Sequence, residues 1–497
     1  MRKSLSFVCI GSAVLFFAVF VHNDGNAQGL ATPLTMQGLD NTVLQSVASR
    51  SMGGLLFNQQ DDASLMFANP ASLSTLQGIQ LSIAGLQQST DVSQTQQWYP
   101  QKYYPELSLL MEGLTNLISN PDPTKPGVVF RNAGDTVQRP FDAIGPNWTH
   151  LANNSLPVQA FVSMPFSIGK TELSAGVGFL EYANLTGYYQ NNNILAPAIG
   201  SQRPLPILLP PATDSVHAYW YQYTQSREGA IYGYGGAISV NVLEGLSAGI
   251  SGMLLSGTTD DAETQVGRGT MFFVYSPQNY FAVDSIYNHI SRTGTSDFSG
   301  EEFTLSAEYR GRYITVGGAV KPPTTITRKY QTRVVTDSMG VHSDVSLGDK
   351  DEMTLPWRGT VGVSLALKEN LSLGFDYELR PFASAVYKNA SGTESNPWLS
   401  ASLMHVGLRY VPAPWLSLRA GVREQAAVFQ EDGAPIGDEP IGYTIYSAGL
   451  GISFEAFRFD LAYEYAHMKY QDLYSTNVNL NSQVTNSVVA GISYELQ

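Results

Sequence analysis

The chain has 497 residues and a formal net charge of −14, and only 14% of its residues are charged. An acidic chain without basic clusters argues against nucleic-acid binding, which draws on clustered Lys and Arg. No apolar run long enough for a membrane helix follows the first 27 residues. Two classes remain, a secreted β-sandwich and a β-barrel that crosses a membrane with strands, in which only alternate residues face lipid.

The N-terminus has the order of a secretory signal peptide. Arg2 and Lys3 precede a largely apolar stretch over residues 5–21, and small and polar residues follow as far as Ala27. We therefore predict a signal peptide over residues 1–27, cleaved after Ala27. A transmembrane anchor is the alternative, and the short apolar core argues against it. Cys9 is the only cysteine, so the mature chain is predicted to hold no disulfide.

Residues 28–77 form a separate segment before the first strand, because they show no strand alternation. A stretch containing Gly53 and Gly54 is followed by Asp62, by small and apolar residues, and then by Asn69-Pro70-Ala71. Pro70 fixes its own φ and keeps the preceding residue out of a helix, while the Asn69 side chain can bond its own backbone. This pattern predicts a rigid turn.

Period-two alternation marks the strands of residues 78–497. In one example, Phe457, Phe459 and Leu461 alternate with Arg458 and Asp460. One face of such strands is apolar and aromatic, and the other is small, polar or ionised. The second face is rich in glycine across many strands, which is unusual for the solvent face of a sandwich. A barrel wall with lipid outside and a filled or wet lumen explains it better.

Fourteen segments show this pattern, which predicts an all-β fold, a 14-stranded antiparallel transmembrane barrel. An even number of strands closes such a barrel without leaving a free edge in the lipid. The segments are Gly78–Leu86, Pro157–Phe166, Glu172–Tyr182, Gly229–Val240, Leu246–Leu255, Glu302–Tyr309, Tyr313–Val320, Leu355–Leu367, Leu371–Leu379, Ala401–Tyr410, Trp415–Arg423, Tyr443–Phe454, Phe457–His467 and Val484–Tyr494.

The connections between these segments alternate in length. The short ones are residues 167–171, 241–245, 310–312, 368–370, 411–414 and 455–456, and the others are much longer. Short turns on one rim and long loops on the other are typical of outer-membrane barrels, with the short turns in the periplasm. An even strand count then places both chain ends in the periplasm as well.

The segment and the barrel together resemble the long-chain fatty acid and hydrophobic-compound transporters of the FadL/TodX family. Asp62 and Asn69-Pro70-Ala71 fit the motif of that family's N-terminal hatch, although Ser72 stands where many relatives carry Gly. The resemblance implies a hatch that plugs the lumen of a Gram-negative outer-membrane barrel. It also implies passive uptake of fatty acids or hydrocarbons by a monomer surrounded by outer-membrane lipid and lipopolysaccharide.

The resemblance further implies that strand three is interrupted, giving a lateral exit to the bilayer. Gly176 and Gly178 face the lumen on this strand, and glycine in a strand marks bulges and bends. We therefore expect the opening at these two residues. The alternative is that they are ordinary members of a lumen face that is rich in glycine throughout.

A carboxylate ligand would need a cation in the lumen, because an unpaired charge in an apolar cavity is costly. Most inward arginines are expected to pair with anions on neighbouring strands. Arg419 is the first candidate, because Ser417 and Gly421 flank it on its own face, and Arg409 is the second. The inward cations are Arg358, Arg380, Arg409, Arg419, Arg423 and Arg458.

The third long loop carries aromatic residues that fit an external capture surface for an apolar ligand. They are Phe272, Phe273, Tyr280 and Phe281. The alternative is that the long loops pack on one another and cap the barrel.

No catalytic or metal-binding motif stands out, so we predict no enzyme activity, no cofactor and no metal. A Ser–His pair formed across strands, as in a barrel phospholipase, is the enzymatic alternative. A FadL-like barrel that docks secreted cargo is the main alternative function. A general porin is a third, against which the N-terminal plug argues.

Overall fold

The computed structural model describes residues 38–40, 42, 44–58, 61–98, 147–197, 215–274, 280–284, 288–338, 340–396, 398–428, 440–474 and 477–496. The predicted signal peptide lies outside the described residues. Within the described ranges, no helix is long and apolar enough to cross a membrane.

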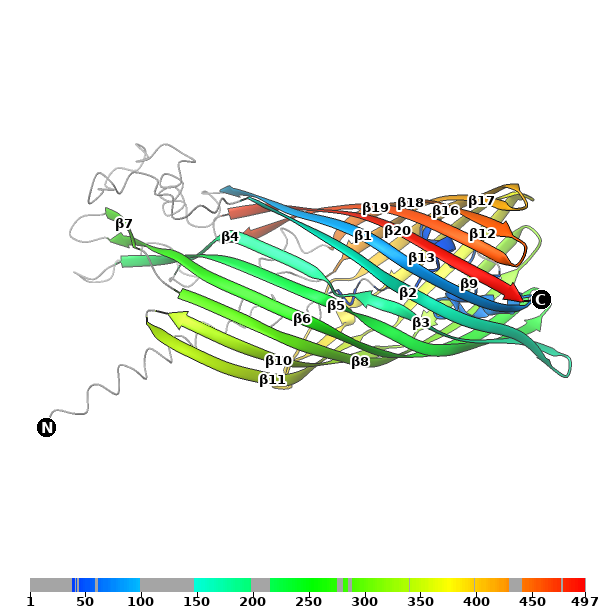
Figure 1. Ribbon diagram of the computed structural model, residues 1–497, viewed down its shortest axis with the longest axis horizontal. Helices are drawn as coiled ribbons and strands as arrows, with labels where there is room; N and C mark the ends of the chain where they lie inside the picture. The colour runs from blue at the N-terminus through cyan, green and yellow to red at the C-terminus, as the bar shows by residue number, and fades with distance from the viewer. Residues whose placement is uncertain are drawn as a thin grey trace.

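The strands close into one antiparallel barrel, in which β1 pairs with both β2 and β20 (Figure 1). The strands are β1 (Ile79–Trp98), β2 (Trp148–Ile168), β3 (Thr171–Asn184), β4 (Gly187–Pro197), β5 (Ser215–Leu243), β6 (Leu246–Val274), β7 (Tyr280–Asp284), β8 (Asn288–Arg310), β9 (Ile314–Lys321), β10 (Thr324–Ser338), β11 (Val341–Leu355), β12 (Arg358–Lys368), β13 (Leu371–Arg380), β14 (Val386–Lys388), β15 (Glu394–Ser395), β16 (Ala401–Ala413), β17 (Leu416–Ala427), β18 (Ile441–Phe454), β19 (Phe457–Tyr474) and β20 (Asn477–Leu496).

Three strands of the wall are each broken into two pieces, namely β3 with β4, β9 with β10, and β11 with β12. The short strands β7, β14 and β15 belong to connections. The wall therefore has fourteen strands, which confirms the predicted fold class and count. Pro322 and Pro323 account for the break after β9, because proline lacks the N–H that a ladder needs.

Every predicted segment overlaps one wall strand, and the short turns lie where they were expected. The strands are much longer than predicted at the opposite end, where β5, β6 and β8 continue far past the predicted bounds (Figure 1). Much of what was predicted as the third long loop is thus strand. Residues 256–267 and 288–300 are polar on both faces, so the alternation that would reveal a strand is missing there.

The two faces of the wall differ as the alternation predicted. On β13, Phe375 is 40% exposed on the outside, while its neighbour Asp376 is 2% exposed on the inside. Large apolar side chains cover the outer surface of the barrel in this way, as they do in barrels that span a membrane.

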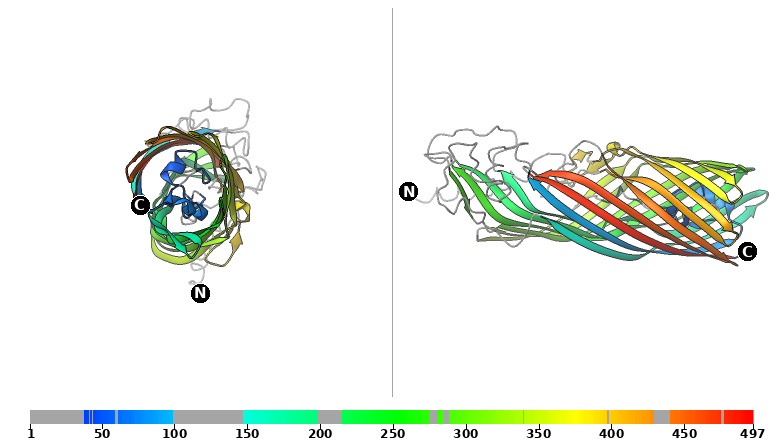
Figure 2. Two further views of the ribbon diagram at one scale, coloured as in Figure 1. Left: turned by 90° about the vertical axis from the view of Figure 1, so that its right-hand side faces the viewer. Right: turned by 90° about the horizontal axis from the view of Figure 1, so that it is seen from above.

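The N-terminal segment, residues 38–77, lies inside the barrel (Figure 2, left). It contains the short helices α2 (Val47–Arg50), η1 (Ala63–Leu65) and η2 (Pro70–Thr75). Glycines on the inner wall make room for it. A Cβ on Gly421 would lie 2.3 Å from the Gly53 nitrogen, and one on Gly249 would lie 2.5 Å from the Ala71 nitrogen. The glycine-rich inner face therefore reflects close packing of this segment.

Candidate functional site

The third strand of the wall loses its partner part of the way along. β3 pairs with β2 only from Thr171 to Leu180, whose partner is Gln159. Beyond that point β2 pairs with β1 alone, and β4 pairs with β5 alone. Among the described strands, no backbone ladder joins residues 148–158 of β2 to residues 181–197 of β3 and β4. We call this discontinuity the lateral seam.

A β-bulge at Tyr182 lies at the end of the seam that is nearer to the short turns. In the ladder with β5, Glu181 lies opposite Tyr232 and Ala183 lies opposite Ile231, so Tyr182 has no partner. Residues 180–183 are consecutively buried, whereas a regular strand would alternate. Tyr182 keeps the inward phase of Ser174 and Leu180, and the extra residue brings the odd-numbered Ala183 and Leu185 to the inner face as well.

Three contacts close the seam without a β2–β4 ladder. On the inside, Thr42 of the N-terminal segment forms an isolated antiparallel bridge with Ala183. Farther along, the His150 ring of β2 stacks on the Tyr188 ring of β4, with centroids 3.8 Å apart and planes 10° apart. The Trp148 ring packs edge-on against the same tyrosine at 5.6 Å. The seam is thus held by side chains and by one residue of the N-terminal segment.

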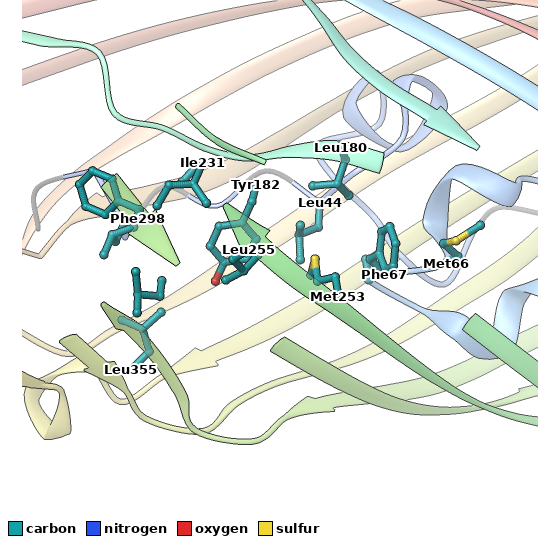
Figure 3. Close-up of a cluster of buried hydrophobic side chains, with 14 of the residues drawn as sticks. Leu44, Met66, Phe67, Leu180, Tyr182, Ile231, Met253, Leu255, Phe298 and Leu355 are labelled. Carbon is teal, nitrogen blue, oxygen red and sulfur yellow. The ribbon is translucent and has the colours of Figure 1, made fainter. Parts of the chain in front are cut away.

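A buried apolar cluster lies directly behind the seam (Figure 3). Leu180, Tyr182, Ala183 and Leu185 belong both to the edge of the seam and to this cluster. Figure 3 shows the side chains in a row that reaches from Phe298 through Tyr182 to the N-terminal segment. The other members labelled there are Leu44, Met66, Phe67, Ile231, Met253, Leu255 and Leu355.

A group of buried polar side chains, which we call the polar node, borders the apolar cluster. Its members are Tyr182, Glu302, Lys321 and Arg358. The Tyr182 hydroxyl donates a 2.7 Å hydrogen bond to Oε2 of Glu302 on β8. Lys321 and Arg358 both form ion pairs with the same carboxylate. The Nε of Arg358 is buried and has no hydrogen-bond partner among the described residues. Two cations thus share one carboxylate beside an apolar surface, an arrangement suited to holding a second anion.

Sequence reasoning identified Arg358 as an inward cation but missed Tyr182, Glu302 and Lys321 as a group. The predicted third segment ended at Tyr182, where the alternation stops, and this was the available signal of a bulge. The node itself depends on which strands become neighbours, which a single strand's pattern does not contain.

Gly176 and Gly178 do not lie at the discontinuity. Gly176 pairs with Ser163 on one side and Ala237 on the other, and Gly178 pairs with Phe161 and Gly235. The ladder is complete at both positions, so the discontinuity between β2 and β3 lies after Leu180 and not at these glycines. A Cβ on Gly176 would lie 2.6 Å from Met66 Cε, so this glycine makes room for the N-terminal segment.

The motif residues attach the N-terminal segment to the wall. The Asp62 carboxylate accepts a 3.1 Å bond from the Ser64 backbone N–H and begins η1. The Asn69 side chain makes no capping bond in its own turn and instead donates to Glu308 of β8 at 2.8 Å. Pro70 is the first residue of η2, and the Ala71 N–H donates to the Ser306 hydroxyl at 2.8 Å.

The two predicted head-group arginines lie near the short turns. The cross-strand partner of Arg419 is Arg409, and Arg419 donates to Asp460 of β19 at 2.6 Å. Its charge is therefore balanced, although no anion flanks it on its own strand. Arg409 forms no ion pair among the described residues and only a long bond, 3.4 Å, to the Ser417 hydroxyl.

The predicted aromatic capture residues lie in strands at the opposite end of the barrel. Phe272 and Phe273 belong to β6, and Tyr280 and Phe281 belong to β7, with Phe273 opposite Phe281 in the register. They form a hairpin far from the short turns. Among the described residues, no group of three or more His, Cys, Asp or Glu side chains is arranged to hold a metal ion.

Comparison with protein-family models gives no match, and no curated protein matches the chain by sequence. Solved structures match over nearly the whole chain. A FadL homologue of Pseudomonas aeruginosa has a TM-score of 0.52 at 12% identity, covering 94% of this chain and 100% of its own. The toluene transporter TodX of P. putida has a TM-score of 0.54 at 13% identity, with 92% and 100% covered.

A third structure, the CymD monoaromatic hydrocarbon channel, has a TM-score of 0.50 at 14% identity and covers 92% of this chain and 99% of its own. At such low identity these likenesses establish the fold. The chain has the fold of the FadL and TodX channels.

Proposed function

We propose that the chain takes up hydrophobic molecules passively across the outer membrane of a Gram-negative cell, with long-chain fatty acids or hydrocarbons as its ligands. The observation that carries this proposal is the lateral seam with the buried apolar cluster directly behind it. The similar structures include a toluene transporter and a monoaromatic hydrocarbon channel, which supports the same class of ligand.

In this proposal the N-terminal segment acts as a hatch that blocks the route along the lumen to the periplasm. It is tied to several strands around the wall. Arg50 forms a buried ion pair with Glu464 of β19, the Leu56 N–H donates to Asp376 of β13 at 2.6 Å, and the Ala63 N–H donates to Gln80 of β1 at 2.7 Å. A ligand that leaves through the lateral seam breaks none of these bonds, whereas a ligand that passes the hatch on its way to the periplasm breaks many.

The lateral route also fits the physical chemistry of an apolar ligand. Each methylene group moved out of water gains about 0.8 kcal/mol, so a ligand that enters the apolar cluster is stabilised there. Passing from the cluster through the seam into the bilayer keeps the ligand out of water. Only the side-chain contacts of the seam and the Thr42 bridge need to move, and no β2–β4 ladder has to break.

Uptake of radiolabelled oleate and of toluene by cells that carry or lack the protein tests the proposal. We expect faster uptake of at least one of them in cells that carry the protein. Equal uptake of both would contradict transport and would favour a barrel that docks secreted cargo.

Crosslinking the seam tests the route. The only native cysteine is in the predicted signal peptide, so His150→Cys with Tyr188→Cys can be joined cleanly by a short bis-thiosulfonate linker. We expect the linked protein to lose uptake and to regain it on reduction. The matched control joins Ala420→Cys to Ala448→Cys, outward-facing partners on β17 and β18. Unchanged uptake in the linked seam variant would rule out lateral exit.

A further inference from the structure

Arg409 is the exception among the described basic side chains inside the barrel. Each other interior arginine or lysine that the structure describes forms an ion pair with a carboxylate, and Arg409 does not. Its nearest polar partner is the Ser417 hydroxyl at 3.4 Å. A guanidinium in this position is short of an anion, because it is half-buried and cannot be fully hydrated.

The nearest cross-strand neighbour of Arg409 is another arginine. Arg419 lies directly opposite it on β17, an arrangement of like charges that is unfavourable in a sheet. Arg419 and Arg458 both use the carboxylate of Asp460, at 2.6 and 2.8 Å. Arg458 also lies 3.6 Å from the carboxylate of Asp62. Neither Asp460 nor Asp62 forms an ion pair with Arg409 among the described residues.

Arg409 also borders open space. It lines a cavity of about 690 Å³ at the short-turn end of the barrel, together with Arg419 and Arg458 and with the carboxylates of Asp61, Glu455 and Glu495. It lines a second cavity of about 350 Å³ as well, which includes Arg310. Arg409 thus lines both cavities, at the short-turn end of the barrel.

One carboxylate of the N-terminal segment faces this region. Asp61 lies within electrostatic range of Arg310, Arg409 and Arg458, but its carboxylate forms no ion pair with any of them among the described contacts. Its backbone has a φ of +53°, in the left-handed region that Asn and Asp tolerate better than other non-glycine residues. Asp61 is therefore a weak internal competitor for whatever anion the arginines attract.

We propose that the short-turn end of the lumen is an anion-binding site, in which Arg409 holds a small oxyanion, a carboxylate or a phosphate. A guanidinium binds both through paired N–H donors. Arg419 and Arg458 add long-range attraction, and the cavity admits the anion from the side that the proposed topology places in the periplasm. The site is separate from the lateral seam and does not depend on the uptake route.

Calorimetric titration of the purified full barrel in detergent tests the site, with inorganic phosphate and acetate as separate probes to distinguish the two sources of oxyanion. We expect Arg409→Gln to weaken binding about tenfold, the usual scale for one charged hydrogen-bonding group. Asp61→Asn keeps the left-handed backbone and removes the competing charge, so binding should become tighter. Arg333→Gln, at an exposed ion pair with Asp344, is the matched control.

The two variants shift affinity in opposite directions, so a general loss of folding cannot imitate the result. Arg409→Lys keeps the charge and should retain part of the affinity. No measurable binding of either probe by the native protein would overturn the proposal. Binding that is unchanged in both Arg409→Gln and Asp61→Asn would overturn it as well, by placing the anion elsewhere.

Discussion

The hydroxyl of Tyr182 donates a 2.7 Å hydrogen bond to Glu302, although 120 residues separate the two in the sequence. This bond connects the bulge at the end of the β2–β3 ladder to β8 on another part of the wall. Glu302 is in turn held by Lys321 and Arg358. The hydroxyl of Tyr182, at the edge of the lateral seam, is therefore held by a charged group that its own strand does not contain.

Tyr182→Phe is expected to loosen the seam. The change removes one hydrogen bond to a charged group, worth roughly 1.5–3 kcal/mol, while the ring stays in the apolar cluster. Hydrogen exchange should become faster at residues 180–187 and stay unchanged in β16 to β18. Tyr463→Phe is the control, because its hydroxyl also bonds a side chain, Asn486, but on the exposed face of β19. Equal effects of the two changes would show that the Tyr182 bond is not specific to the seam.

Lys321→Met is expected to separate the two classes of ligand. The variant leaves Glu302 paired with Arg358 but removes the excess positive charge beside the apolar cluster. Uptake of oleate should fall by about tenfold, since a carboxylate would lose one charged partner, and uptake of toluene should not change. Lys350→Met, at an exposed pair with Glu352, is the control. A parallel fall for both ligands would mean that the node supports the fold and does not select a head group.

Gly421→Ala is expected to displace the N-terminal segment. The added Cβ would lie 2.3 Å from backbone atoms of Met52 and Gly53. Because β17 belongs to a closed wall, its backbone cannot move far to relieve the clash. Such overpacking typically costs about 1–3 kcal/mol. Hydrogen exchange across residues 47–56 should quicken, and cells should become more permeable to small hydrophilic antibiotics. Gly442→Ala, where nothing lies within 4 Å, should change neither measurement.

The packing of the N-terminal segment around Asp40 against the barrel wall is expected to depend on pH. Burial raises the pKa of the Asp40 carboxyl from 3.8 to about 6, although Arg380 lies nearby. The folded state therefore binds the proton more tightly than the unfolded state does. The packing of this part of the N-terminal segment should be most stable below about pH 4 and should weaken by roughly 2–3 kcal/mol as the pH rises through about 6 to about 7.

Hydrogen exchange near Asp40, compared at about pH 4 and about pH 7 after correction for intrinsic rates, measures this effect. Asp40→Asn cannot ionise, so it should be protected equally at both values. If the variant keeps the pH dependence of the native protein, another group is responsible.

The short-turn ends of the strands were well predicted because strand facing is a local property. The alternation of Phe457, Phe459 and Leu461 with polar residues identifies the outer face of β19 without knowledge of its neighbours. The opposite ends were underestimated, since residues 256–267 of β6 and 288–300 of β8 are largely polar on both faces. The same local reasoning chose Arg419 over Arg409, because it considered only residues on the same strand.

The sequence by itself determined the barrel class, the strand count, the short turns and the position of the N-terminal segment in the chain, because each of these follows from patterns within a few neighbouring residues. Only the tertiary structure decided that Asp460 neutralises Arg419, that Arg409 forms no ion pair among the described residues, and that the ladder between β2 and β3 ends at Leu180. These features depend on the register between strands that are distant in the sequence. Register is set when the closed wall and the segment inside it pack together, and no single strand encodes it.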